Sequence, residues 1–229
     1  MNIKSHWLDG ASLVFSVVVI GVALILMIQQ GFFSANLLQD TNLSWHLIRS
    51  AGTVAYVLLT TSVLWGLALS SRVVKDWSPG VLSMVMHSTL SWLAVILAAG
   101  HALLLLVDSY FHYSLSDVVI PFTGPYRPFA VGLGTLALWV SFAVAISFAF
   151  KDRMGHRAWK LLHYTSYITF AMATVHGLLA GKDASLLGFK LLIAFCVVAV
   201  VVFTTHRINL ALEKEAAPRP VAAKSRRSR

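Results

Sequence analysis

The sequence predicts an all-α membrane protein, a bundle of six transmembrane helices whose N and C termini both lie in the cytoplasm. Three observations predict this fold class. Of the 229 residues, 58% are apolar and only 12% are charged, a balance that soluble domains of this size do not have. Apolar runs long enough to cross the hydrocarbon core of a bilayer, about 20 residues each, occur six times. Basic residues gather in alternate loops, as expected when the loops lie on opposite sides of a membrane.

The six runs use nearly the whole chain and leave no room for a soluble catalytic domain between them. The first run follows a single basic residue, Lys4, and lacks a clear cleavage site of small residues, so we expect a retained helix and not a signal peptide. The organisation predicted is a cytoplasmic N-terminus (1–11), a transmembrane domain (12–206) and a basic, disordered cytoplasmic tail (207–229). The expected spans are 12–30, 48–70, 82–107, 130–150, 158–180 and 187–206.

The basic residues predict the orientation. With both termini inside, fourteen Lys and Arg residues fall on the cytoplasmic side and four fall outside. This bias places the protein in the cell membrane with an even number of spans. It also explains the net charge of +9 without nucleic acid as a partner, because the charge lies in short loops and in the tail. The four outer residues are Arg49, Arg127, Lys182 and Lys190.

Four histidines lie within two of the predicted spans, and they are the strongest functional signal in the chain. His87 and His101 lie in the third span, and His163 and His176 lie in the fifth. An ionisable residue at bilayer depth is costly, so it is expected to have a function. Imidazole is a standard axial ligand of haem iron, and neither pair has a Cys or an acidic residue between its members to suit another metal. The pattern predicts two haems.

The third and fifth spans run in the same direction, which predicts how the histidines pair. His87 and His163 share the inner level and would hold the inner haem, while His101 and His176 share the outer level. On an ideal helix, the side chains of His87 and His101 point in directions about 40° apart. Those of His163 and His176 point about 140° apart. Either the fifth span contains a tightened or bulged turn, or its two haems are approached from different sides.

Other charged residues have both a functional interpretation and an ordinary one. Arg49 and Arg127 fall at the outer ends of their spans, where a guanidinium can bind a haem propionate or can serve simply as an interfacial anchor. The basic segment 151–160 is either a cytoplasmic anchor or a docking surface for an acidic electron donor.

At these residues the chain resembles the ferric reductase-like transmembrane family, the membrane haem domain of ferric reductases and NADPH oxidases. The resemblance covers about residues 45 to 206. It rests on the two His pairs and on four shorter motifs: Arg49-Ser-Ala-Gly52 with Tyr56, Asp117-Val-Val-Ile-Pro-Phe122, Tyr126-Arg-Pro128, and Trp159-Lys-Leu-Leu-His163 with Tyr167. The chain is also similar to the stand-alone haem subunit of periplasmic methionine sulfoxide reductase. That subunit has fewer ligand positions in its third helix, so the presence of both His87 and His101 favours two haems.

The resemblance implies an oxidoreductase that carries electrons across the membrane through two haems. Only 23 residues follow His206, so no flavin or nicotinamide site is expected, and a separate flavoprotein or quinol would supply electrons. The acceptor would be ferric iron, oxygen or a periplasmic partner. An alternative is a haem-binding membrane anchor or subunit of a periplasmic reductase system. A transporter is disfavoured because the histidines are the only ionisable groups at membrane depth.

Overall fold

The computed structural model describes residues 6–29, 41–71, 73–74, 79–108 and 111–216, and these residues form helices and loops without a strand. The long helices are α1 (His6–Gln29), α3 (Thr41–Ser70), α4 (Gly80–Leu104), α6 (Pro128–Ser147), α8 (His156–Ala180) and α9 (Leu187–Ala216). The short elements are η1 (Leu105–Val107), α5 (Leu115–Val119), η2 (Phe148–Phe150), α7 (Lys151–Met154) and η3 (Lys182–Ser185).

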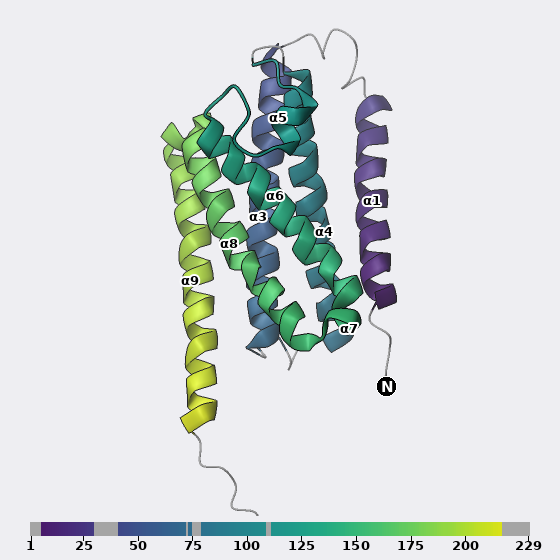
Figure 1. The fold of residues 1–229 in the computed structure, drawn as a ribbon, viewed down its shortest axis with the longest axis vertical. Coiled ribbons are helices and arrows are strands. Elements are labelled where there is room, and N and C mark those ends of the chain that lie inside the picture. Colours follow the sequence, from purple (N-terminus) through teal and green to yellow (C-terminus); the bar gives the residue numbers. More distant parts are fainter. Residues whose placement is uncertain (1–5, 30–40, 72, 75–78, 109–110, 217–229) are drawn as a thin grey trace, which may run out of the picture.

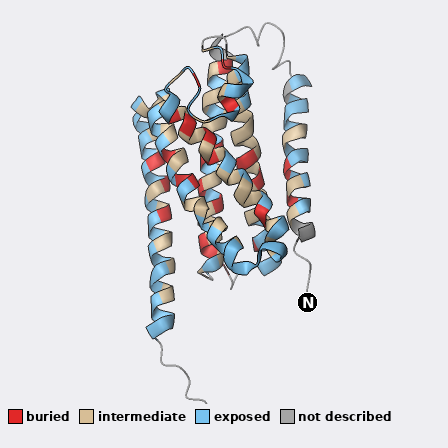
Figure 2. Cartoon of the chain, in the orientation of Figure 1, coloured by how far each residue is buried: buried red, intermediate tan, exposed pale blue. Residues whose placement is uncertain are grey.

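Five of these helical segments are long and apolar enough to cross a membrane, and the protein is therefore a multi-pass integral membrane protein. They are Asp9–Leu26, Ser44–Ser70, Gly80–Val107, Pro128–Met154 and Leu187–Ala216. Their surfaces agree with a lipid solvent, because large apolar side chains point outward along α1 and α9, for example Phe15 at 58% and Phe195 at 71% exposure. Figure 2 shows the buried positions concentrated on the inward sides of the helices.

The segment expected as the fifth span forms α8, which is as long as α4 but more polar. Its 25 residues include His156, Arg157, Lys160 and both histidines of the expected second ligand pair. A 25-residue helix rises about 37 Å, which exceeds the hydrocarbon thickness of a bilayer. Figure 1 shows α8 running back along the bundle between α6 and α9, so that α1 begins and α9 ends at the same end of the molecule.

Four helices form the centre of the bundle. α3 packs on α4, α4 on α6, α6 on α8 and α8 on α3, which places α4 and α8 on one diagonal and α3 and α6 on the other. The diagonal partners have few close backbone contacts within the described part of the chain, so only side chains reach across the middle. α1 lies outside against α4, and α9 lies outside against α3. The centre of the bundle is therefore the place where residues of α4 and α8 meet.

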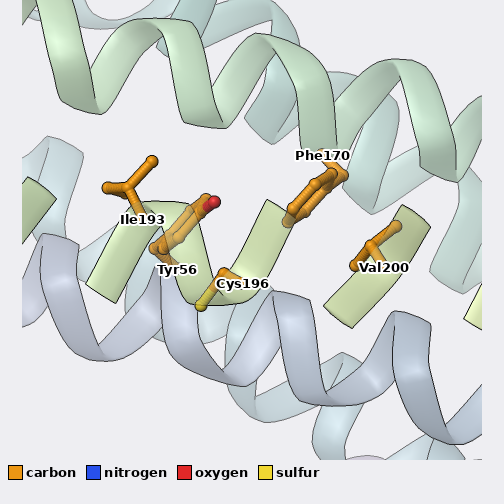
Figure 3. Close-up of a cluster of buried hydrophobic side chains, with 5 residues drawn as sticks. All are labelled: Tyr56, Phe170, Ile193, Cys196 and Val200. Atoms are coloured by element: carbon orange, nitrogen blue, oxygen red, sulfur yellow. The ribbon is translucent and has the colours of Figure 1, made fainter. Parts of the chain in front are cut away.

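A small apolar cluster holds α9 to the centre. Tyr56 of α3 and Phe170 of α8 stack with ring centroids 5.7 Å apart, and residues of α9 pack against them (Figure 3). The Tyr56 hydroxyl lies 2.9 Å from the Thr174 hydroxyl, which satisfies both groups away from water. The α9 members of the cluster are Ile193, Cys196 and Val200.

The boundaries of the helices differ most from the predicted spans at the start of α1, at the start of α3, which begins at Thr41 and not at 48, and at the end of α9. α9 continues to Ala216, so the first ten residues of the expected disordered tail are helical. They are rich in Leu, Ala, Glu and Lys, which favour helix without needing burial. Residues 217–229 lie outside the described part of the chain. α1 begins at His6, within the predicted N-terminal segment 1–11.

Candidate haem-binding sites

Two pairs of imidazoles meet across the α4–α8 diagonal. The ring centroids of His87 and His163 are 6.1 Å apart at an interplanar angle of 67°. Those of His101 and His176 are also 6.1 Å apart, at 76°. The structure thus brings together the four predicted ligands in the predicted combination. Fourteen helical residues separate the two levels on α4, a rise of about 21 Å.

α8 meets both partners without a break in its helix. No 3-10 or π turn interrupts α8 between His156 and Ala180, so the expectation of a tightened or bulged turn is wrong. The helix instead runs obliquely across the bundle, as Figure 1 shows, and its two histidines, thirteen residues apart, both meet histidines of α4. An unbroken α8 leaves the other alternative, in which the two haems would lie on different sides of this helix.

Backbone carbonyls hold the outer pair in place. His101 Nδ1 lies 2.8 Å from the Ile48 carbonyl oxygen of α3, and His176 Nδ1 lies 2.8 Å from the Ala130 carbonyl oxygen of α6. A carbonyl can only accept, so each Nδ1 carries the hydrogen and each Nε2 keeps its lone pair. Metal-ligating histidines typically donate their second ring N–H in this way.

Glycines make these carbonyls accessible. In a helix, the side chain of residue i+4 covers the backbone carbonyl of residue i. The residue four positions after Ile48 is Gly52, and the residue four positions after Ala130 is Gly134, so neither carbonyl is covered. A Cβ on Gly52 would lie 2.9 Å from His101 Cε1, and a Cβ on Gly134 would lie 2.7 Å from His176 Nδ1. Each imidazole therefore fills the space that a side chain would take.

The same register continues to the inner level. Gly66 faces His87, with a Cβ that would lie 3.0 Å from His87 Cε1. Gly52 and Gly66 are fourteen residues apart, as are His87 and His101, and the antiparallel α3 and α4 pair them in opposite order. In α6 the corresponding step of thirteen residues from Gly134 reaches Ser147, a buried residue whose hydroxyl donates to the Val144 carbonyl at 2.7 Å.

The inner pair has different neighbours from the outer pair. His87 Nδ1 has no hydrogen-bond partner of ordinary length and angle, although the Ser62 carbonyl stands in the equivalent place before Gly66. The His163 ring stacks on Trp159 at a centroid distance of 5.1 Å and an angle of 25°. Lys151 Nζ lies over the same indole, 4.5 Å from its centroid. A cation and an aromatic ring thus lie beside the inner pair.

The number of ligands limits which metal group the pairs can hold. Among the described residues, no three His, Cys, Asp or Glu side chains cluster closely enough to hold a metal ion. A bare zinc site needs three or four protein ligands, whereas two imidazoles suffice when a porphyrin fills the equatorial positions. Two imidazoles on opposite sides of one metal, each at about 2.0 Å, have ring centroids about 6 Å apart. The four histidines therefore fit two bis-imidazole haems.

The structure gives the two arginines protein partners. Arg49 Nε donates to Asp183 Oδ2 at 2.6 Å, a second nitrogen of Arg49 pairs with the other carboxylate oxygen, and the guanidinium lies over Trp45 at 3.9 Å. Arg127 donates to the Leu179 carbonyl and has left-handed backbone with φ 39°. Arg49 and Arg127 thus tie the ends of α3 and α6 to the outer end of α8. Propionate binding by either residue stays a prediction.

The outer loop motif has a structural role. Ser114 caps α5, accepting from the Asp117 N–H at 3.3 Å while Asp117 Oδ2 accepts from the Ser114 N–H at 2.9 Å. Hydrogen bonds from the side chain and then the backbone of Ser114 hold the pKa of the Asp117 carboxyl below its usual value. This capping box accounts for Asp117 in the motif 117–122 as a helix-capping residue, and no bound ligand is needed to explain it.

The sequence analysis missed the glycines and Asp183. The equal spacing of Gly52–Gly66 and His87–His101 was a usable signal, because antiparallel neighbours with equal spacing can meet twice. Asp183 offered no such signal, since it follows α8 in a short 3-10 turn and reaches Arg49 only through the fold. Comparison of the chain with protein-family models, curated proteins and solved structures finds no match in any of the three, so the site itself carries the functional argument.

Proposed function

We propose that this protein passes single electrons across the membrane through two b-type haems, from a donor on the cytoplasmic side to an acceptor at the outer face. The observation that carries the proposal is the pair of imidazole couples, each 6.1 Å apart, on the α4–α8 diagonal. His87 and His163 would hold the inner haem, and His101 and His176 the outer one. The donor would be a separate flavoprotein or quinol, and the acceptor ferric iron, oxygen or a periplasmic partner.

The orientation follows from the charges at the two ends of the bundle. α8 would be the sixth span, with Thr169 and Thr174 buried and its two paired histidines half-buried against the neighbouring helices. The end that carries α7, the start of α8 and the end of α9 holds six Lys and Arg residues of the described chain, whereas the opposite end holds four. The six are Lys151, Arg153, Arg157, Lys160, Arg207 and Lys214. The positive-inside rule then puts the α7 end, and with it both termini, in the cytoplasm.

The haem supplies the one-electron chemistry when it is bound, and the chain supplies the ligands and their surroundings. The four histidines would hold the two haems as their protein ligands, and this would keep external molecules from coordinating the metal. The carbonyls of Ile48 and Ala130 fix the outer rings, and the stack on Trp159 orients His163. An oxidoreductase with this arrangement exchanges electrons at the cofactor edge.

The first test is the haem content of the purified full chain. We expect two haems per chain, with low-spin spectra before and after dithionite, because each metal would have two imidazole ligands. The measurement is haem stoichiometry by pyridine haemochrome against protein concentration. One haem per chain would favour the alternative, a haem-binding subunit or anchor of a periplasmic reductase system. None would contradict the proposal.

A second prediction concerns the cytoplasmic donor. Reversing Arg153, Arg157 and Lys160 to Glu should slow haem reduction by an acidic flavoprotein at low salt by about tenfold or more, because these exposed cations steer the donor. Reduction by dithionite should keep its rate. Lys190→Glu at the opposite end is the matched control and should leave both rates unchanged. Equal flavoprotein rates in the triple variant and the parent would point to quinol as the donor.

A further inference from the structure

The two imidazole pairs differ in what their second ring nitrogens contact. In the outer pair both Nδ1 atoms donate to carbonyl oxygens at 2.8 Å, those of Ile48 and Ala130. In the inner pair His87 Nδ1 makes no hydrogen bond of ordinary length and angle, although the Ser62 backbone stands nearby, and His163 lies against Trp159 with Lys151 on the indole. A glycine lies against three of the four imidazoles, and counting thirteen residues along α6 from the third of these glycines reaches Ser147.

We propose that the Ile48 and Ala130 carbonyls, exposed by Gly52 and Gly134, act as positioning groups that give the outer metal a lower reduction potential than the inner metal. The inference rests on the proposed function, since it concerns the potentials of the two haems. It goes beyond that function by assigning an order to the two sites and naming the residues that set the order.

The physical reason lies in the electron density of the ligands. An imidazole that donates its Nδ1 hydrogen to a carbonyl becomes a more electron-rich ligand, which stabilises the oxidised metal. Both outer ligands have this bond at 2.8 Å, and His87 has no carbonyl bond of ordinary length and angle. The positive charge of Lys151 acts in the opposite direction at the inner site, because a nearby cation stabilises the reduced state. Both effects make the reduction potential of the outer haem lower than that of the inner haem.

The order has a consequence for transport. A membrane potential that is negative inside favours outward movement of negative charge. When the outer site has the lower reduction potential, outward electron movement depends on that driving force. By exposing the carbonyls that lower the outer potential, Gly52 and Gly134 would make the rate of outward electron transfer depend on the membrane potential.

Gly52→Ala and Gly66→Ala form a matched pair of variants. Each new Cβ would press on the imidazole Cε1 at nearly the same distance, 2.9 Å at His101 and 3.0 Å at His87. Only Gly52→Ala can displace a ring from a carbonyl to which it is hydrogen-bonded. We expect Gly52→Ala to raise the midpoint potential of the outer haem, and Gly66→Ala to shift the inner midpoint less, because the displaced His87 ring has no 2.8 Å carbonyl bond to lose. Equal shifts in both variants would overturn the inference.

Lys151→Met provides a second variant at the edge of the bundle, where folding is not at risk from overpacking. It removes the charge over Trp159 and should lower the inner midpoint potential while the outer one stays in place. An unchanged inner midpoint, or an outer haem of higher potential than the inner in the parent protein, would overturn the inference. These titrations use the full haem-loaded chain in lipid nanodiscs. A parent chain without haem would instead contradict the proposed function, so the two failures are distinguishable.

Discussion

Replacing His87 or His163 with alanine is expected to remove the inner haem and leave the outer haem in place, which halves the haem bound per chain. Either substitution removes one of only two protein ligands, and no other His, Cys or acidic cluster of the described residues can take its place. A single remaining imidazole in a partly apolar site holds b-type haem weakly, because no covalent bond anchors the macrocycle. The measurement is haem stoichiometry combined with a redox titration that resolves the two components.

Control and contradiction follow from the same experiment. His206→Ala replaces an exposed histidine of α9 outside both pairs and should keep two haems. Loss of the same spectral component in His87→Ala and His101→Ala would contradict two separate sites. Retention of two low-spin haems in both His87→Ala and His163→Ala would contradict the inner pairing.

The sequence predicted which histidines meet, because transmembrane topology strongly restricts the possibilities. Two parallel spans with histidines at similar spacing can align them in only one order, and the structure has that order. The boundaries of the spans were predicted to within a few residues in the interior of the chain, since apolar runs have sharp ends in loops with Gly, Pro and charged residues. At α9 the apolar run ended before the helix did, because helix propensity continues where hydrophobicity stops.

The surroundings of the ligands were not predictable in the same way. Which carbonyl faces His101 depends on the rotation of α3 about its own axis, and that rotation is set by packing against α4 and α9. The stack of Trp159 on His163 joins residues one turn apart, so its spacing was visible, but aromatic residues near a span end also suit the membrane interface. The pairing of Arg49 with Asp183 needs the outer end of α8 to meet α3.

The polar character of α8 illustrates the limit of hydropathy as a guide. Its histidines, threonines and basic first turns reduce its apolar character below that of the other long helices, although it lies between α6 and α3 in the bundle. Buried Thr169 and Thr174 satisfy their hydroxyls on carbonyls one turn earlier, at 3.2 and 2.8 Å. The histidines and threonines of α8 thus contribute to making a central helix the least apolar one.

Replacing His101 or His176 with alanine is expected to abolish electron transfer across the membrane while the inner haem can still be reduced from the cytoplasmic side. The substitution removes the outer ligands and leaves the inner pair, about 21 Å away along α4, untouched. Oriented proteoliposomes test this result directly. The cytoplasmic face is exposed to an impermeant reductant, and a ferric chelate is enclosed on the other side.

Parent protein should reduce the enclosed chelate, and the His101→Ala and His176→Ala proteins should show inner-haem reduction at the parent rate with no chelate reduction above empty vesicles. Without the outer haem, an electron on the inner haem has too long a distance to cross to the outer face. The loss of chelate reduction should therefore be nearly complete and equal in the two variants. His112→Ala is the matched control. His112 lies in the outer loop with a backbone φ of 47°, outside both histidine pairs, and its variant should transfer electrons normally. Chelate reduction at the parent rate in His101→Ala would show that electrons leave from the inner site, and would remove the outer pair from the path.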